Sequence, residues 1–181
     1  MQLSTPRIAP VSEAEFRRMA KDVIGREVAP DEEVLNITLT YARHPALLKA
    51  QGALQEHLGA RSTLPHRDHE LVILRMGWRC RSEYEVSQHS LRGATPEDLR
   101  RIAVGPDAEG LSAWDALLIR TVDELVDDHF ISDGTWTKLA ERYTPEQLID
   151  LVALIGRYWT VSVWLNTMGV QLEPGKPRIT F

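Results

Sequence analysis

Cysteine is nearly absent from the sequence, which has one thiol, Cys80, in 181 residues. A single cysteine cannot form an intramolecular disulfide, so a disulfide-stapled scaffold and a Cys-x-x-Cys redox centre are both excluded. Low-complexity segments are also missing, and no run of residues alternates between apolar and polar over the length of a β-strand. These absences favour a helical protein without covalent cross-links.

Signals for export, membranes and nucleic acids are missing as well. The first residues, MQLSTPRIAPVSEAEF, contain no apolar segment of signal-peptide length. No uninterrupted apolar run approaches the roughly eighteen residues of a membrane span. The net charge is −5 and no run of five or more basic residues occurs, which disfavours binding to phosphate backbones. We therefore expect a cytoplasmic protein with no membrane or nucleic-acid partner.

The composition is that of an ordinary soluble domain, with 43% hydrophobic and 26% charged residues. Helix-start signals recur along the chain: a capping hydroxyl followed by proline and glutamate occurs at 95–97 and 144–146, and Ser12 with Glu15 forms a capping box. Gly25 and Gly93 suit helix ends. The pattern predicts an all-α bundle with a non-helical tail, its helices beginning at about residues 12, 31, 46, 65, 79, 95, 112, 134 and 145.

Four side chains in the middle of the sequence could carry chemistry. If residues 78–89 form one helix, Trp78, Ser82, Glu85 and His89 fall within an arc of roughly 60° and share a face. Glu85 and His89 are four residues apart, so their side chains can interact directly. Such a pair can transfer protons, can ligate a metal, or can be a solvated pair on an exposed helix, which the polar neighbours would suit.

The stretch LPHRDHELVILRMGWRCRSEYEVSQHSLRGATPEDL resembles the signature region of the carboxymuconolactone decarboxylase/AhpD-like family. That family shows an R-x-x-E-L helix, then a Cys-x-x-Cys-x-x-x-His or related motif, then a helix start like TPEDL. The resemblance extends over about residues 35–172. It implies a single AhpD-like helical domain at 31–172, preceded by an arm and first helix at 1–30 and followed by a tail at 173–181.

The motif carries over residue by residue with one departure. Glu70 matches the family's glutamate and His89 its histidine, whereas the two cysteine positions fall on Ser82 and Glu85. A dithiol peroxidase needs one thiolate to attack the peroxide and a second thiol to resolve the sulfenic acid. Dithiol peroxidase chemistry is therefore excluded. The resemblance then implies the branch typified by the lactone decarboxylase, which works without a cofactor.

We accordingly expect a cofactor-free acid/base enzyme that decarboxylates, isomerises or hydrolyses a small organic acid or lactone. His89 would be the general acid/base, Glu85 or Glu70 its carboxylate partner, and Ser82 a hydrogen-bond donor to the substrate. Two buried carboxylates near each other would raise the pKa of one of them. A binding-only oligomeric module and a metal enzyme using Glu70, Glu85 and His89 stay open as alternatives.

Four further residues are candidates for substrate binding: Trp78, Arg75, Trp159 and Asn166. A guanidinium such as that of Arg75 suits a carboxylate, and Asn166 matches an asparagine often seen near the end of the family's domain. Trp159 could equally serve core or oligomer packing. The resemblance also implies assembly into trimers or hexamers.

Two weaker sites complete the prediction. His66 and His69 could ligate a metal together with Glu70, but they lie at a polar helix start that we expect to be exposed. Cys80 is most simply a small buried hydrophobe, although its flanking arginines could lower its pKa.

Overall fold

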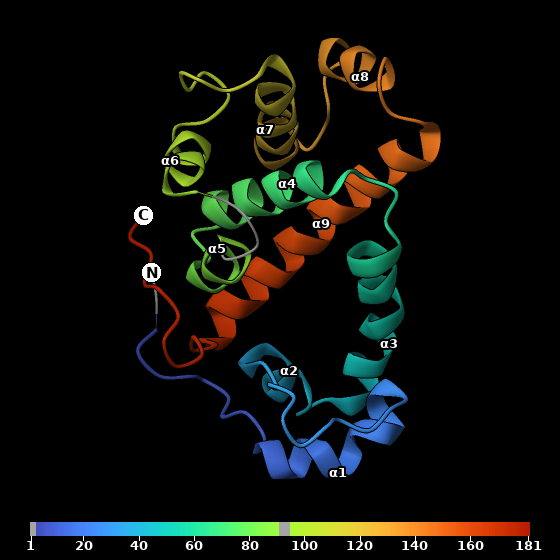
Figure 1. Ribbon diagram of the computed structural model, residues 1–181, viewed down its shortest axis with the longest axis vertical. Coiled ribbons are helices and arrows are strands. Elements are labelled where there is room, and N and C mark those ends of the chain that lie inside the picture. The colour runs from blue at the N-terminus through green and yellow to red at the C-terminus, as the bar shows by residue number, and fades with distance from the viewer. Residues whose placement is uncertain (1–2, 91–94) are drawn as a thin grey trace. The chain divides into compact units, whose positions relative to one another are not determined.

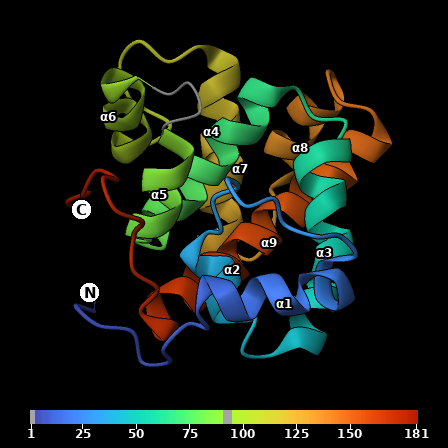
Figure 2. The same cartoon turned by 60° about the horizontal axis from the view of Figure 1, so that its bottom comes forward.

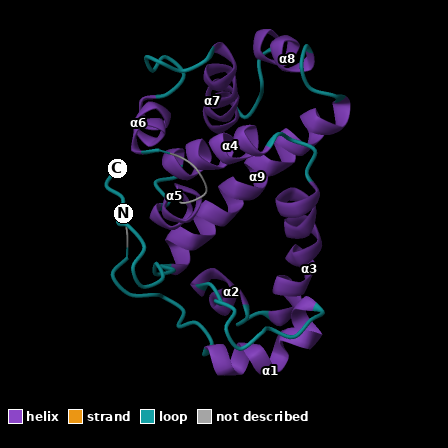
Figure 3. Ribbon diagram, in the orientation of Figure 1, coloured by secondary structure: helices purple, strands orange, loops and turns teal. Residues whose placement is uncertain are grey.

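The computed structural model describes residues 3–90 and 95–181, and every regular element in those residues is helical (Figures 1 and 3). The all-α class is therefore confirmed. The helices are α1 (Glu13–Ile24), α2 (Asn36–Tyr41), α3 (Pro45–Glu56) with a π-helical extension (His57–Arg61), α4 (His66–Arg79), α5 (Glu83–Ser90), α6 (Pro96–Val104), α7 (Ala113–Asp127), α8 (Asp133–Ala140) and α9 (Pro145–Met168).

Backbone contacts divide the chain into two compact units. The first unit contains Met1–Arg61 and Leu165–Lys176, and the second contains Ser62–Trp164 and Pro177–Phe181. The domain boundaries implied by the resemblance, at 30 and 172, stay a prediction.

The first unit is built around α1, α2 and α3 (Figure 2). Its core includes Phe16 and Ala20 of α1 and Leu39 of α2. Helix α1 begins after Ser12, whose hydroxyl accepts a hydrogen bond from the Glu15 amide. It ends at Gly25, whose φ of 77° is a left-handed conformation that favours glycine. The sequence signals for this helix are thus confirmed at both ends.

The second unit is organised around α4, which packs against α5, α6 and α7. All residues from Asp68 to Gly77 are buried, as expected for a helix without a solvent face. Its polar residues are paired: Asp68 accepts hydrogen bonds from the Tyr143 hydroxyl at 2.6 Å and from the indole nitrogen of Trp114, on α7, at 3.0 Å. Buried carboxylates with such partners fix the packing of neighbouring helices.

Three predicted element boundaries were wrong. The helix predicted over 31–43 is confined to α2, because the Asn36 amide is capped by the Glu173 carboxylate at 2.8 Å, a tertiary contact that local sequence does not reveal. The helix predicted over 46–59 continues past Gly59 as the π-helical turn. The stretch predicted over 79–92 begins only at Glu83, and the predicted end at Gly93 lies outside the described residues.

Helix α9 is long and apolar enough, by length and composition, to span a membrane. Half of its most apolar 18-residue window is buried inside the protein, and the core helices of soluble proteins pass the same test of length and composition. Its buried Asp150 accepts hydrogen bonds from Ser62 and Thr63 and so fixes the segment that leads into α4.

Candidate active site

A glycine in α4 lets α5 approach closely. An added Cβ at Gly77 would lie 3.1 Å from the Glu85 Cβ and 3.2 Å from the Val86 Cγ2, tighter than ordinary van der Waals contact. Gly77 lies within the continuous helix α4. It is the point at which α5 packs against α4, and it fixes the position of Glu85.

We expect Gly77→Ala to destabilise the protein by about 1–3 kcal/mol, because α5 must move away from α4. Gly52→Ala is the matched control, since Gly52 lies in α3 with open space around it and an alanine there gains up to about 1 kcal/mol of helix propensity. Urea unfolding of both variants measures the difference. A Gly77→Ala protein as stable as Gly52→Ala would contradict the packing described here.

The connection between α4 and α5 is a sharp turn at Cys80, Arg81 and Ser82. Arg81 has a φ of 50°, which is uncommon for a residue with a side chain. Ser82 follows, with its amide donating to the Gly77 carbonyl at 2.8 Å and its carbonyl accepting from Val86 at 3.1 Å. The prediction of one helix face from Trp78 to His89 was therefore wrong, because Trp78 lies on α4 before the turn.

The turn brings four buried ionisable side chains into a chain of contacts. The Glu70 Oε2 lies 2.9 Å from the His89 Nδ1, and the Glu70 Oε1 lies 3.3 Å from the His69 Nδ1. The other His89 nitrogen, Nε2, lies 3.5 Å from the Glu85 Oε2. None of the four residues exposes more than 8% of its surface. We call Glu70, His89 and Glu85 the Glu–His–Glu group; the structure brings these three predicted residues together.

The Glu70 carboxylate is strongly stabilised in its ionised form. Burial is the largest single influence and acts to raise its pKa, but the hydrogen bonds and charges of His69 and His89 together outweigh it and lower the pKa to about 2. The pKa of Glu70 is thus lowered, whereas we expected a raised pKa for one of the two neighbouring carboxylates. The two imidazoles, rather than the second acid, dominate its surroundings.

His89 is held more firmly on one side than on the other. Its Nδ1 makes a short hydrogen bond to Glu70, whereas the Nε2 contact to Glu85 is long. The ring of Tyr158, from α9, packs edge-on against the imidazole with centroids 5.3 Å apart. These contacts fix the ring plane and leave the Nε2–Glu85 side as the looser end of the group.

The Ser82 hydroxyl is a buried polar group without a hydrogen-bond partner in the described part of the chain. Ser82 is fully buried and precedes α5, where a serine usually caps the helix through its side chain. Here the hydroxyl does not cap. A buried hydroxyl without a partner costs about 1–3 kcal/mol, so its retention calls for an explanation beyond folding.

The other predicted site residues lie elsewhere. Arg75 is committed to structure: its guanidinium forms a bidentate pair with Asp123 of α7 at 2.7 and 2.8 Å and donates to the Ile102 carbonyl of α6. The prediction of Arg75 as a substrate ligand is therefore wrong, because its guanidinium is occupied by protein partners. Trp78 is half-buried against Phe181, with ring centroids 4.9 Å apart.

The remaining two stay predictions or lie apart. Trp159 does not join the Glu–His–Glu group, since it points away from the core with 51% of its surface exposed. Asn166 is assigned to the first unit of the chain, and its part in substrate binding stays a prediction.

Sequence reasoning missed the part that His69 plays. It considered His69 only as a metal ligand together with His66 and Glu70, at a helix start expected to be exposed, whereas His69 is buried. The structure instead places its Nδ1 beside the Glu70 carboxylate. Tyr158 was visible in the sequence only as one of several aromatic residues in α9.

Cys80 is a weak candidate for a reactive thiol. It is partly buried beside the Met76 sulfur at 3.6 Å. Burial is the main influence and raises its pKa, against the opposing effects of Ser162 and Arg79. Because the thiolate is the reactive form, we expect iodoacetamide to label Cys80 more slowly at pH 7.5 than it labels glutathione. Equal or faster labelling would contradict this environment.

No group of three or more histidine, cysteine, aspartate or glutamate side chains within residues 3–90 and 95–181 is arranged to hold a metal ion. In the Glu–His–Glu group the donor and acceptor atoms face each other directly. Elemental analysis of the purified protein tests the metal alternative.

Comparison with solved structures finds several proteins of similar fold. A cysteine-to-alanine variant of the debrominase Bmp8, in complex with 2,3,4-tribromopyrrole, has a TM-score of 0.73 at 15% identity, covering 96% of this chain and 95% of that chain. An uncharacterised peroxidase-related protein with an alkylhydroperoxidase AhpD core, from Ralstonia eutropha, has a TM-score of 0.70 at 17% identity, covering 96% and 92%. A putative antioxidant defence protein AhpD from Agrobacterium tumefaciens has a TM-score of 0.64 at 19% identity, covering 74% and 94%.

The chain is therefore an all-helical protein with the AhpD-like fold. This confirms, at the level of the fold, the resemblance seen in the sequence. Comparison with protein-family models and with curated proteins finds no match. The described residues of this chain carry the Glu–His–Glu group and have a single cysteine, Cys80.

Proposed function

We propose that the protein is a cofactor-free acid/base enzyme that acts on a small organic acid or lactone by decarboxylation, isomerisation or hydrolysis. The observation that carries the proposal is the buried Glu–His–Glu group, in which one imidazole lies between two carboxylates. Burying three ionisable groups together costs folding free energy, so such clusters mark functional sites more often than structural ones.

In this mechanism Glu70 orients the ring and His89 moves the proton. Glu70 binds the Nδ1, which fixes the tautomer and stabilises the imidazolium that forms when the Nε2 takes a proton. The Nε2 would remove a proton from the carbon next to the substrate's carbonyl group and return it to another atom. Glu85, beside the Nε2, would accept or supply the proton in the second half of the reaction.

Ser82 would stabilise the negative charge that develops on the substrate oxygen. Its buried hydroxyl has a free donor, which is what an enolate or a lactone oxyanion requires. In decarboxylation, carbon dioxide leaves and the electron pair of the broken carbon–carbon bond moves into the enolate. His89, which has first taken a proton from solvent, then protonates the carbon and returns to the neutral imidazole.

The fold neighbours support a small-molecule substrate but not one particular reaction. The debrominase of similar fold is bound to a small aromatic molecule, and others are described as peroxidase-related. With one cysteine, this chain cannot follow a dithiol route. The proposed function requires neither a nucleic-acid nor a membrane partner.

The test of the proposed function is proton exchange. The protein is incubated in D₂O with a panel of lactones, unsaturated acids and 2-oxo acids, and loss of C–H signals, isomerisation or decarboxylation is followed by ¹H NMR. At least one class should exchange catalytically, and Cys80→Ser should retain the full rate. Tight binding of a panel member without any exchange would favour the alternative of a non-catalytic ligand-binding module.

Ser82→Ala separates a catalytic role from a structural one. Removing a hydroxyl that stabilises developing charge should lower turnover roughly 10²-fold. The same change removes an unsatisfied buried polar group, so the free energy of unfolding should stay the same or rise by about 1 kcal/mol. A variant that loses stability while keeping its turnover would contradict the role given to Ser82.

A further inference from the structure

A second buried hydroxyl, that of Ser162, has no hydrogen-bond partner in the described part of the chain. Ser162 lies in the second half of α9 and exposes none of its surface. Hydroxyls on helices often donate to the carbonyl four residues earlier, as Thr160 does to Gly156 at 3.0 Å and Thr121 does to Leu117 at 2.8 Å. The Ser162 hydroxyl does not use this local partner. Folding therefore leaves a fully buried donor unsatisfied, and such a group calls for a partner from outside the fold.

The Ser162 side chain borders the Glu–His–Glu group. Tyr158, one helical turn earlier on α9, packs against the His89 ring with centroids 5.3 Å apart. The Ser162 hydroxyl lies beside the thiol of Cys80, in the turn that leads into α5. The chain from Cys80 to His89 therefore runs alongside α9 in the opposite direction, and Ser162 lies at the end of this stretch that carries Ser82.

The Cys80 thiol does not satisfy the Ser162 hydroxyl. Burial is the largest influence on the Cys80 pKa and raises it, whereas the nearby Ser162 hydroxyl lowers it by less. The sulfur is therefore a protonated thiol at neutral pH, which is a weak hydrogen-bond acceptor. Glu85 also raises the pKa of this thiol, so Ser162 and Glu85 both lie near the same sulfur atom. The hydroxyl is thus left for a group that enters this region.

We infer that Ser162 is a second substrate-binding residue, whose hydroxyl donates a hydrogen bond to an oxygen of the substrate. The inference rests on the proposed function and narrows its substrate class. Two buried hydroxyls without protein partners, Ser82 and Ser162, suit a molecule with two oxygen functions, such as a 2-oxo acid. A compound with one oxygen function would leave one donor unsatisfied. Ser82 binds the oxygen on which charge develops, and Ser162 binds an oxygen whose charge does not change.

Steady-state kinetics of Ser162→Ala tests the inference with the panel member that is turned over fastest. Loss of one hydrogen bond to an oxygen of constant charge should raise KM by roughly 2- to 10-fold and leave kcat within about two-fold. The urea midpoint should stay the same or rise, because the change removes an unsatisfied donor. An unchanged KM would overturn the inference and would show that Ser162 serves only as a small residue beside Cys80.

Ser87→Ala is the matched control for loss of a buried serine hydroxyl. Ser87 is as fully buried as Ser162, but its hydroxyl donates to the Pro177 carbonyl at 3.0 Å. Its alanine variant should therefore unfold at a lower urea concentration and keep the wild-type KM. A rise in KM as large in Ser87→Ala as in Ser162→Ala would overturn the inference, because the effect would then be a general one of disturbed packing.

Binding separates a failure of this inference from a failure of the proposed function. Titrations followed by ¹H–¹⁵N NMR need no turnover, with 2-oxobutyrate as the probe and butanone as its analogue with one oxygen function. Ser162→Ala should weaken 2-oxobutyrate binding by roughly 2- to 10-fold and leave butanone binding unchanged. If this pattern is found while no panel member is turned over, the binding role of Ser162 stands and the acid/base function fails. No binding of 2-oxobutyrate, or equal affinities in wild type and Ser162→Ala, would overturn the inference.

Discussion

Replacing His89 with alanine should lower turnover of the substrate found by proton exchange by roughly 10²–10⁴-fold, the usual contribution of a positioned general acid/base. The loss should appear mainly in kcat, because the Nε2 acts on the reacting atoms rather than on the remainder of the substrate. The variant removes the ring from between Glu70 and Glu85, so the two carboxylates lose their shared partner.

His89→Ala needs controls for folding and for the direction of the effect. His89→Asn keeps a polar side chain near Glu70 but cannot carry a proton. It should therefore be more stable than the alanine variant and have a similarly low turnover. His66→Ala, at the exposed start of α4, should leave turnover at the wild-type level. Turnover that survives His89→Ala within a factor of about three would remove the imidazole from the mechanism.

Acidification should destabilise the protein through Glu70 in particular. The folded protein holds the pKa of Glu70 at about 2, against an ordinary value of 4.5. A carboxylate whose pKa is lower in the folded state stabilises that state when the pH is above the pKa of the same group in the unfolded chain. This stabilisation is lost as the pH falls from 4.5 towards 2. Each pKa unit corresponds to about 1.4 kcal/mol, so Glu70 should contribute about 3 kcal/mol at neutral pH.

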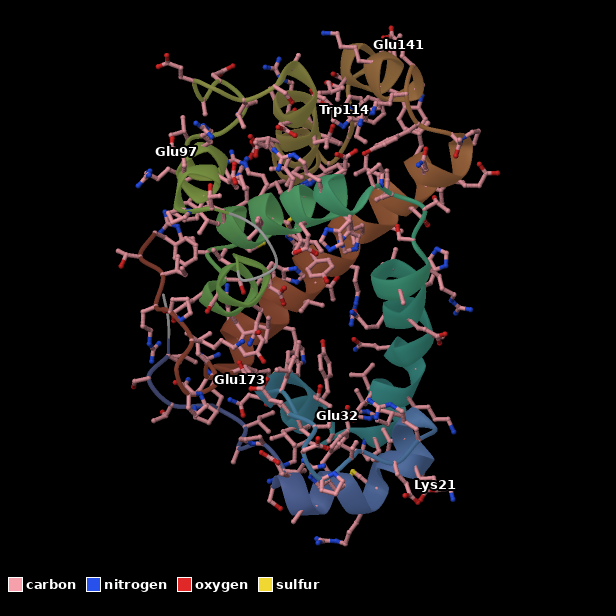
Figure 4. All side chains as sticks on the ribbon, viewed as in Figure 1. Lys21, Glu32, Glu97, Trp114, Glu141 and Glu173 are labelled. Carbon is pink, nitrogen blue, oxygen red and sulfur yellow. The ribbon has the colours of Figure 1, made fainter. Side chains whose placement is uncertain are left out.

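The contribution of Glu70 can be isolated with Glu70→Gln. Urea unfolding of wild type and variant at intervals from pH 7 to pH 3 should show a stability difference that is constant above pH 5 and shrinks below it. The same substitution at exposed Glu141 (Figure 4) serves as the control for loss of one negative charge. A wild-type advantage over Glu70→Gln that does not depend on pH would show that Glu70 is not held ionised by its neighbours.

The helices were largely predictable because their signals are local. A capping hydroxyl, a proline in the first turn and a glycine after the last turn act within a few residues, and Ser12, Thr95 and Ser112 all accept the expected amide hydrogen bonds. Helix α2 was misjudged because its cap comes from Glu173, which is distant in sequence. A contact of that kind has no local signature.

The candidate site was predictable in its members but not in its geometry. Glu85 and His89 were found from their four-residue spacing, and Glu70 came from the motif resemblance. The turn at Arg81, which folds α5 back onto α4, depends on one left-handed backbone conformation at a residue type that rarely adopts it. The engagement of Arg75 with Asp123, likewise, depends on the packing of α7 against α4.

The close approach of α5 to α4 explains how His89 reaches the buried Glu70 of α4. Gly77 allows α5 to approach α4 closely, and the turn after α4 presents the beginning of α5 to the buried glutamate of that helix. Any side chains at positions 82 and 85 are then carried into the same buried region. In this chain they are a hydroxyl and a carboxylate.

The ionisation of Glu70 in the folded protein is the most direct test of the Glu–His–Glu group. A ¹³C NMR titration of side-chain carboxyl groups, with Glu70 assigned by its absence from Glu70→Gln, should find it still ionised at pH 3 in the wild type and protonating at higher pH in His89→Ala. A midpoint near 4.5 in the wild type, unchanged when the ring is removed, would contradict the account.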